Sequence, residues 1–327
     1  MNGPGGRLLS PPGGGASRAR PHALIKVMDR RLLVISPVRN EAEHLERVAR
    51  AMAAQSRPPD RWLIVDDHST DDTQTLAMRL AQEIPFIAVL RAPEHPPLSD
   101  PRDRLASAAA PRTFNFGLQS TGLRNYTHVA KLDGDMELPP GYFERILAEF
   151  AADPRLGMAG GLRRELVRDR WRLERVPTEH HVNGALKCYS RECLEAIGGI
   201  EERLSWDIID ETTARMRGFR TRSFEDLVAI HHRPWASADG TLRGRARYGA
   251  SAYIARFPVY WVTARSLKVA ASRPAGLSGL AFLYGYAKAA LRRTPRVEDE
   301  EFRRAVRREL RGRIRARLPL ATRAATG

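Results

Sequence analysis

Four apolar runs of strand length organise the first half of this chain, and each is followed by a polar turn or loop. They are residues 31–37, 62–65, 86–90 and 128–132. Helices are predicted between them, at residues 41–54, 73–83 and 112–121. In the first of these helices, Leu45, Val48 and Met52 recur at helical spacing. Strands that alternate with helices predict an α/β fold that begins βαβαβ.

The second half of the chain has a less regular pattern. Residues 184–189 and 227–231 are predicted strands, and residues 210–217 are a predicted helix between them. We therefore expect a mixed sheet. Ligands bind open sheets of this kind beyond the carboxyl ends of the strands, which is where the polar turns of the first half would gather.

The formal net charge of +16 is distributed unevenly along the 327 residues. Residues 1–30 carry +4 and residues 236–327 carry +14, which leaves −2 for residues 31–235. We therefore predict a small-molecule enzyme domain over residues 31–235 and a basic helical region over residues 236–327. Residues 1–30 are rich in Gly and Pro and lack the apolar stretch of a signal peptide, so they are expected to form a disordered leader.

The triplet Asp133-Gly134-Asp135 follows the fourth apolar run. Side chains at positions i and i+2 of an extended chain share a face, and two close carboxylates are costly unless a cation neutralises them. Mg²⁺ or Mn²⁺ accepts one or two carboxylates together with substrate phosphate oxygens. The triplet alone is also compatible with an ordinary turn.

The triplet stands in a specific order of motifs. The segments are residues 35–41 (ISPVRNE), 65–71 (VDDHSTD), 112–117 (RTFNFG) and 131–135 (KLDGD). Together they resemble the family-2 glycosyltransferases over residues 31–234. The resemblance implies a GT-A fold with helices on both faces of a mixed sheet, a nucleotide-diphosphate sugar donor, a Mg²⁺ or Mn²⁺ cofactor and inversion at the anomeric carbon. It also implies a role in cell-envelope or exopolysaccharide glycan synthesis.

The resemblance assigns donor-binding roles to the first two motifs. Pro37, Arg39 and Glu41 would lie against the nucleoside. Asp66 would shape the second turn, and Asp67 would hydrogen-bond the base.

The next two motifs would hold the diphosphate and the metal ion. Arg112 matches a basic residue that meets the diphosphate, and Asn115 matches a residue that lets the helix approach the nucleotide. Asp133 would reach the ribose or the metal ion, and Asp135 would coordinate the metal ion directly. The resemblance also suggests a histidine ligand, for which His231 is chosen, although the strand pattern leaves His232 open.

The catalytic base should be a carboxylate that removes the proton of the acceptor hydroxyl. Residues 206–211 (WDIIDE) resemble the acidic motif of the family, although its usual Glu-Asp pair is not intact. Asp207 is the favoured base and Asp210 is the second candidate. Asp210 and Glu211 could instead stabilise the start of a helix.

The basic C-terminal region suggests a membrane interface. Residues 276–291 are largely apolar and flanked by arginines, but a helix of this length reaches only about 24 Å against a hydrocarbon core of about 30 Å. An in-plane or re-entrant helix on an anionic membrane is favoured, and a helix packed on the domain is the alternative. We expect a cytoplasmic protein at the inner face of the membrane that acts on a glycan or lipid-linked acceptor.

Two other protein classes fit the sequence less well. A sugar-phosphate nucleotidyltransferase would have a Gly-rich loop and a Lys after the first strand, where this chain has Pro37 to Glu41. A basic nucleic-acid-binding protein would fit the net charge, but the chain has no nucleic-acid-binding motif, and the acidic triplet opposes that partner.

Overall fold

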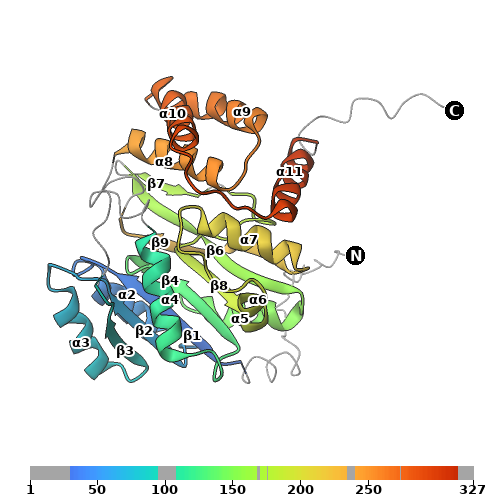
Figure 1. Cartoon of the computed structure of the whole chain (residues 1–327). Coiled ribbons are helices and arrows are strands. Elements are labelled where there is room, and N and C mark those ends of the chain that lie inside the picture. Colours follow the sequence, from blue (N-terminus) through green and yellow to red (C-terminus); the bar gives the residue numbers. More distant parts are fainter. Residues whose placement is uncertain are drawn as a thin grey trace, which may run out of the picture.

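The computed structural model describes residues 30–94, 108–167, 170–174, 176–233, 240–272 and 274–315, so the predicted leader lies almost wholly outside the described residues. A nine-stranded sheet forms the centre of the described part (Figure 1). Its strands are β1 (Leu32–Val38), β2 (Arg61–Asp66), β3 (Ile87–Arg91), β4 (His128–Leu132), β5 (Met136–Glu137), β6 (Leu156–Val167), β7 (Arg170–Leu173), β8 (Leu186–Ser190) and β9 (Arg220–His231).

The order of the strands is β3-β2-β1-β4-β8-β6-β9-β5, with β7 paired to β6. Strands β1 to β4 pair in parallel, whereas β8 is antiparallel to both β4 and β6. The predicted mixed sheet is therefore confirmed. The strand predicted at residues 227–231 is the end of the longer strand β9, which runs parallel to β6.

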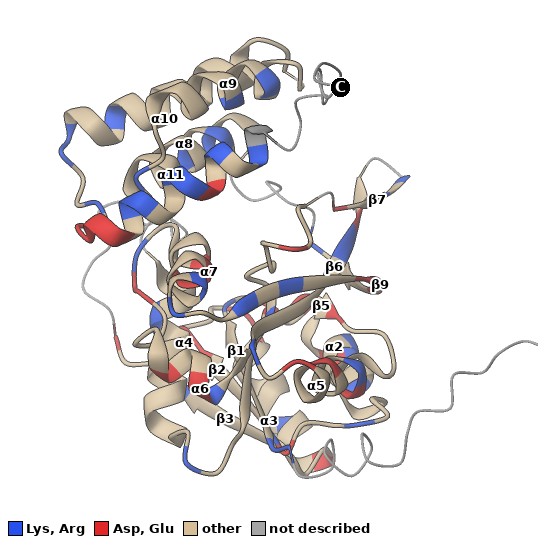
Figure 2. Cartoon of the chain, turned by 90° about the vertical axis from the view of Figure 1, so that its right-hand side faces the viewer, with Lys and Arg blue, Asp and Glu red and all other residues tan. Residues whose placement is uncertain are grey.

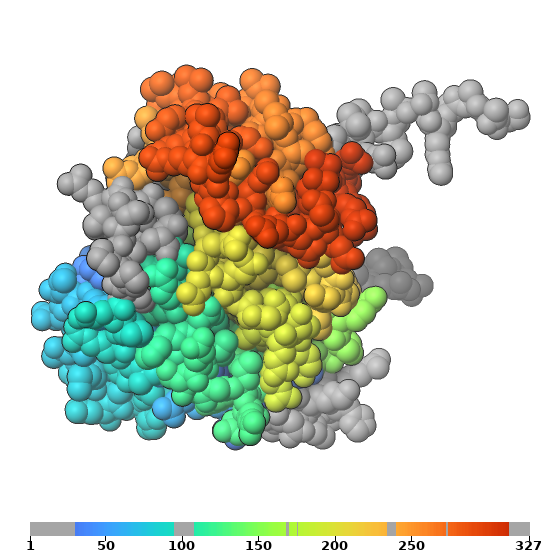
Figure 3. Space-filling model, viewed as in Figure 1, coloured from blue at the N-terminus to red at the C-terminus, as the bar shows by residue number. Residues whose placement is uncertain are grey.

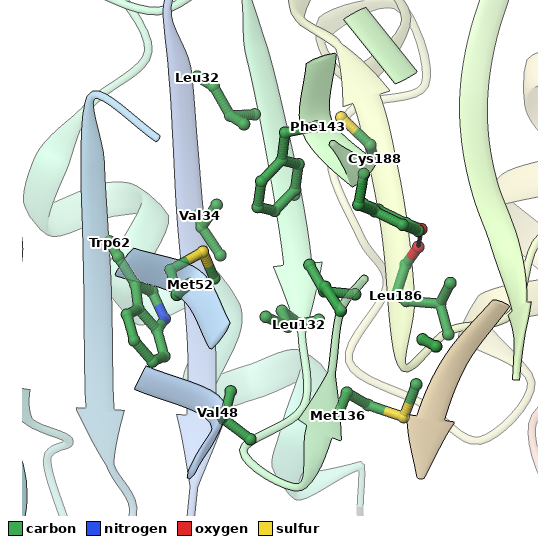
Figure 4. Close-up of a cluster of buried hydrophobic side chains, with 14 of the residues drawn as sticks. Leu32, Val34, Val48, Met52, Trp62, Leu132, Met136, Phe143, Leu186 and Cys188 are labelled. Atoms are coloured by element: carbon green, nitrogen blue, oxygen red, sulfur yellow. Dashed lines mark hydrogen bonds between the residues drawn. The ribbon is translucent and has the colours of Figure 1, made fainter. Parts of the chain in front are cut away.

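Helices cover both faces of the sheet because apolar side chains in its central strands alternate between the faces. Leu32 and Val34 belong to the cluster beneath α2 (Leu45–Ala53), α3 (Thr73–Glu83) and α5 (Tyr142–Ala152). Leu33 and Ile35 belong to the cluster beneath α4 (Ala109–Thr121), α6 (Arg191–Ala196) and α7 (Trp206–Met216). Figure 4 shows part of the first cluster, in which Trp62, Phe143 and Leu186 come from three different elements.

Four helices follow the sheet domain at one end of the molecule (Figure 1). They are α8 (Thr241–Ile254), α9 (Val259–Ala270), α10 (Leu277–Leu291) and α11 (Glu300–Arg315). Lys and Arg recur along them (Figure 2), as expected from the charge distribution. None of the described helices has both the length and the apolarity needed to cross a bilayer.

Helices α8 and α10 meet backbone to backbone. A Cβ atom at Gly249 would lie 1.9 Å from the carbonyl oxygen of Phe282, and one at Gly285 would lie 1.8 Å from that of Ala246. Neither position can therefore accept a larger residue without moving a helix. The inner side of α10 thus packs against the other C-terminal helices α8 and α9.

Helix α11 rests on α7, as Figure 3 shows for the red and yellow segments. Phe302, Val306 and Leu310 are buried in a cluster that includes Ile209 of α7. Arg215 donates two hydrogen bonds to the Glu309 carboxylate, at 2.7 and 2.9 Å. The C-terminal helices are thus anchored to the helix that carries Asp207 and Asp210.

Candidate active site

The turns after β1 and β2 form one interlocked surface at the carboxyl edge of the sheet. The side-chain oxygen of Asn40 accepts a hydrogen bond from the Thr70 backbone amide at 2.8 Å, and the Asn40 backbone amide donates to the Ser69 hydroxyl at 3.0 Å. Asn40 has a positive φ of 56°, which Asn tolerates better than most residues. The Glu41 amide donates to the Thr73 hydroxyl at 2.7 Å, so the chain turns before α2 begins at Leu45 rather than at residue 41.

The residues predicted to hold the nucleoside lie on this surface. Pro37 is opposite Val65 in the parallel register, and Arg39 donates to the Asp67 carbonyl at 2.8 Å. Asp66 accepts weak hydrogen bonds from the Ser69 amide at 3.3 and 3.4 Å, consistent with a role in shaping the turn. The side chains of Asp66 and Asp67 are both buried.

Gly134 lets the acidic triplet lie directly on the first turn. A Cβ atom at position 134 would lie 2.9 Å from the Val38 side chain and 3.0 Å from the Glu41 side chain, so a larger residue would require these side chains to shift. Glu41 is only 7% exposed, and Arg233 donates to its carboxylate at 2.8 Å. Burial, with the nearby charge of Asp135, raises the pKa of Glu41 to about 8.

Asp135 meets His231 because β5 pairs with the end of β9. Met136 is opposite His231 in this antiparallel pair, and the His231 Nε2 atom lies 3.4 Å from the Asp135 carboxylate. Glu165 lies 3.7 Å from His231 Nδ1. Burial opposes a charge on His231, but the interactions with Asp135 and Glu165 outweigh it and raise its pKa to about 9.

His232 points to a different set of partners. Its Nε2 atom lies 2.7 Å from the Glu137 carboxylate, and its Nδ1 atom lies 3.1 Å from a guanidinium nitrogen of Arg47. Its ring also stacks on His44, with 5.7 Å between the ring centres. Of the two histidines that the sequence left open, His231 is therefore the one beside the acidic triplet.

Asp133 is the more accessible carboxylate of the triplet, with 37% of its side chain exposed. Lys131 donates to its carboxylate and also to the Gly184 carbonyl at 3.1 Å. The Asp133 backbone is fixed as well, because its amide donates to the Ala185 carbonyl at 2.9 Å. The side chain is thus held at the end of β4 and faces outward.

The donor atoms of this edge suit a divalent cation that also binds phosphate. Asp135 and His231 are adjacent. Asp133 and Glu41 add two further carboxylates, and the charge of Asp133 contributes to the raised pKa of Glu41. Within the described ranges, no group of three or more Asp, Glu, His or Cys side chains is placed so that it could hold a metal ion by itself. The adjacent pair Asp135 and His231 would supply two ligands, and a cation there would take the others from a bound diphosphate and water.

Arg112 and Asn115 both contact the loop after α6. The Arg112 guanidinium lies 3.5 Å from the Glu202 carboxylate, and Asn115 donates to the Ile200 carbonyl at 2.8 Å and to Glu202 at 3.2 Å. Two residues after Asn115, a Cβ atom at Gly117 would lie 2.9 Å from the Val65 side chain. Gly117 thus lets α4 approach the strands that carry the nucleoside turns.

The two base candidates have different environments on α7. Asp210 is 3% exposed, and its carboxylate accepts hydrogen bonds from Lys187 at 2.9 Å and from Tyr189 at 2.6 Å. Burial raises the pKa of Asp210, against the opposing effect of Lys187. Asp207 is half-buried at the start of the helix. Of the two side chains, Asp207 is therefore the more accessible.

Four residues that were not predicted as site residues contact the candidate carboxylates or His231: Lys131, Glu165, Lys187 and Arg233. Arg233 could have been predicted as a site residue, because it directly follows the two candidate histidines His231 and His232. Lys187 gave no local signal, because its carboxylate partners Asp210 and Glu211 lie 23 and 24 residues further along the chain.

Comparison with known proteins identifies the family. The model of glycosyl transferase family 2 matches residues 33–226. The chain belongs to this family. Among solved structures, it is similar to a mannosyltransferase from Pyrobaculum calidifontis in complex with GDP-Man and Mn²⁺. That match has a TM-score of 0.50 and 19% identity, and it covers 88% of this chain and 81% of the other.

A second similar structure is that of GalNAc-T7 with UDP, GalNAc and Mn²⁺. Its TM-score is 0.57 with 12% identity, and the match covers 89% of this chain and 58% of that one. At such low identities these likenesses concern the fold alone. The family-2 chain described here is a glycosyltransferase with a GT-A fold, as its motifs predict.

Proposed function

We propose that this family-2 enzyme transfers a sugar from a nucleotide-diphosphate donor to an acceptor hydroxyl, with inversion at the anomeric carbon, in the assembly of a cell-envelope or exopolysaccharide glycan. The main support for the proposal is the contact between Asp135 and His231, together with the partly exposed carboxylate of Asp133 in the same triplet. A buried acidic turn at the carboxyl edge of a parallel sheet suits a phosphate-bearing ligand with a divalent cation.

Asp133, Asp135 and His231 would hold Mg²⁺ or Mn²⁺. When bound, the cation neutralises negative charge that develops on the departing diphosphate. The turns after β1 and β2, with Pro37, Arg39, Glu41, Asp66 and Asp67, would hold the nucleoside. Arg112 and Asn115 would contact the donor from α4.

Asp207 would act as the general base. The acceptor oxygen attacks the anomeric carbon from the face opposite the diphosphate, a carbon–oxygen bond forms to the acceptor, and the bond to the diphosphate oxygen breaks. The acceptor proton passes to Asp207, and the nucleoside diphosphate leaves with the bonding electron pair. Asp210 would instead stabilise α7 and its surroundings through Lys187 and Tyr189.

The acceptor is proposed to be lipid-linked and to be reached at an anionic membrane surface on the cytoplasmic side. Helices α9 and α10 expose apolar side chains on their outer faces: Val259, Tyr260, Leu267, Leu277, Leu280, Tyr284 and Leu291. The spacing of those on α10 places them along one side of the helix. Lys288 and Arg292 are exposed beside them, and such basic residues attract anionic lipid headgroups.

A thermal-shift screen of nucleotide sugars, with and without Mn²⁺, tests the central proposal. At least one nucleoside diphosphate or its sugar conjugate should raise the melting temperature, and chelation of the metal should remove most of the rise. Duplex DNA serves as the polyanion control. Stabilisation by DNA, with none by any nucleotide in the presence of metal, would refute the proposal.

A further inference from the structure

A cavity of about 820 Å³ separates the sheet domain from the C-terminal helices. The hairpin of β6 and β7 and the helix α7 form one side, and α8, α9 and α11 form much of the other. A volume of this size is in the range of sites that hold ligands with several ring-sized groups. None of the donor-binding residues assigned above lines the cavity.

The cavity begins beside the candidate metal residues. Arg163 and Glu165 line it, and both also contact His231: the Arg163 guanidinium lies 3.4 Å from His231 Nδ1, and the Glu165 carboxylate lies 3.7 Å from it. A molecule in the cavity would therefore lie close to His231.

The described lining is cationic. It includes seven Arg or Lys side chains and four Glu side chains. Three of those carboxylates are already paired: Glu174 with Arg163 at 3.4 Å, Glu309 with Arg215 at 2.7 Å, and Glu211 with Lys187 at 3.0 Å. These ion pairs neutralise most of the carboxylate charge, and because Arg and Lys outnumber Glu in the lining, the cavity has a net positive charge.

Arg172 on β7 and Lys268 on α9 bring positive charge to the cavity from its two sides. Both are exposed, and neither forms an ion pair or side-chain hydrogen bond within the part of the chain that the structure describes. A phosphate group is a suitable partner for such a site, because Arg and Lys bind phosphate oxygens through charge-assisted hydrogen bonds.

The remaining lining is largely apolar and comes from the C-terminal helices. Phe257, Trp261, Val269 and Phe282 contribute to it. Helix α9 belongs to two surfaces at once, because Lys268 and Val269 line the cavity whereas the neighbouring Leu267 is 76% exposed on the outside. An apolar chain that entered along α9 would stay in contact with apolar side chains.

We infer that this cavity is the acceptor subsite and that it binds an acceptor in which a phosphate or diphosphate group is joined to an apolar chain. The inference rests on the proposed function, which it deepens by naming the site and the chemistry of the acceptor. The cationic side chains hold the phosphate, and the wall formed by the C-terminal helices holds the first part of the apolar chain.

Isothermal titration of the full chain with farnesyl phosphate, kept below its aggregation concentration, tests the inference. Farnesyl phosphate should bind at least about tenfold more tightly than either farnesol or inorganic phosphate, because only it carries both groups. The double variant R172E/K268E should weaken that binding by about tenfold or more. R307E is the matched control, since Arg307 is exposed on α11 and does not line the cavity.

The same preparations are titrated with nucleoside diphosphates in the presence of Mn²⁺. Retained nucleotide binding in the double variant shows that it is folded. If farnesyl phosphate then binds wild type and double variant equally, the acceptor subsite lies elsewhere although the proposed function stands. Equal binding of inorganic phosphate would overturn the apolar part of the inference. Failure of every nucleoside diphosphate to bind the wild type would overturn the proposed function itself.

Discussion

Lys131 on β4 and Lys187 on β8 are cross-strand partners, and both ammonium groups lie 5.4 Å from the centre of the Trp206 ring. Like charges placed opposite each other in an antiparallel pair are unfavourable, so each needs its own anion. Lys131 pairs with Asp133, and Lys187 pairs with Asp210 and Glu211. The acidic triplet and the acidic start of α7 are therefore joined through two neighbouring lysines.

Replacement of Lys187 by Met should lower the free energy of unfolding by about 3 kcal/mol, because two buried carboxylates would lose their cation. Urea unfolding followed by circular dichroism measures the change. Lys288→Met, at an exposed position on α10, should change stability by less than about 0.5 kcal/mol. Equal effects of the two substitutions would contradict a structural role for the buried lysine.

Asp207→Asn should reduce the rate of nucleoside diphosphate release during transfer by about 100-fold or more, because an amide cannot accept the acceptor proton. Nucleotide binding and stability should stay near the wild-type values. Asp210→Asn should instead lower the free energy of unfolding by about 2 kcal/mol, since it weakens the bonds from Lys187 and Tyr189. Normal turnover of the Asp207 variant would exclude it as the base.

His231→Ala should weaken Mn²⁺-dependent binding of a nucleoside diphosphate by about tenfold or more, because it removes the imidazole beside Asp135. His232→Ala is the matched control. It should leave this binding nearly unchanged, because His232 is engaged by Glu137 and Arg47. Calorimetric titration compares the two, and the reverse ranking would assign the metal ligand to His232.

His128 should make the fold sensitive to acid. Burial, with the nearby Arg30 guanidinium, lowers the pKa of His128 to about 3 from an ordinary value of 6.5. The unfolded chain therefore takes up this proton first, and stability falls as the pH drops from about 6.5 towards 3, by at most about 1.4 kcal/mol per pH unit from this group. In His128→Gln, the difference in unfolding free energy between pH 6.5 and pH 4 should be smaller. An unchanged difference would show that other groups govern acid stability.

Leu267→Glu combined with Leu280→Glu should abolish cosedimentation with vesicles that contain anionic lipid, since both side chains lie on the exposed apolar faces of α9 and α10. Met78→Glu is the control, because Met78 is 56% exposed on α3, in the sheet domain. Loss of vesicle binding in both variants, or in neither, would refute the proposed membrane face.

The first half of the fold was predictable because its signals are local. The helix over residues 73–83 and the strand over residues 128–132 have the predicted bounds. Strand β6 was not predicted, although it lies between β8 and β9 in the sheet. It contains Gly157, Gly160 and Gly161, and glycine is depleted in strands. Tertiary packing explains a glycine here, because a Cβ atom at Gly161 would lie 2.2 Å from the Leu227 carbonyl oxygen.

The candidate site was predictable in its motifs but not in its connections. Asp133 and Asp135 were identified from spacing and from the order of the motifs. The choice between His231 and His232 depends on the register of β5 against β9, which no local pattern encodes. The buried state of Asp210 depends in the same way on Lys187, a residue of another strand.

The close approach of α8 and α10 at Gly249 and Gly285 has a mechanical consequence. At these two positions no side chain separates the backbones of α8 and α10. Helix α10 therefore cannot move towards α8 unless α8 moves as well. At the other side of α8, the Ser205 hydroxyl donates to the Ser251 carbonyl at 2.8 Å, immediately before the turn that starts at Trp206. A displacement of α10 would therefore shift α8, whose Ser251 carbonyl is hydrogen-bonded to the residue that immediately precedes the first turn of α7.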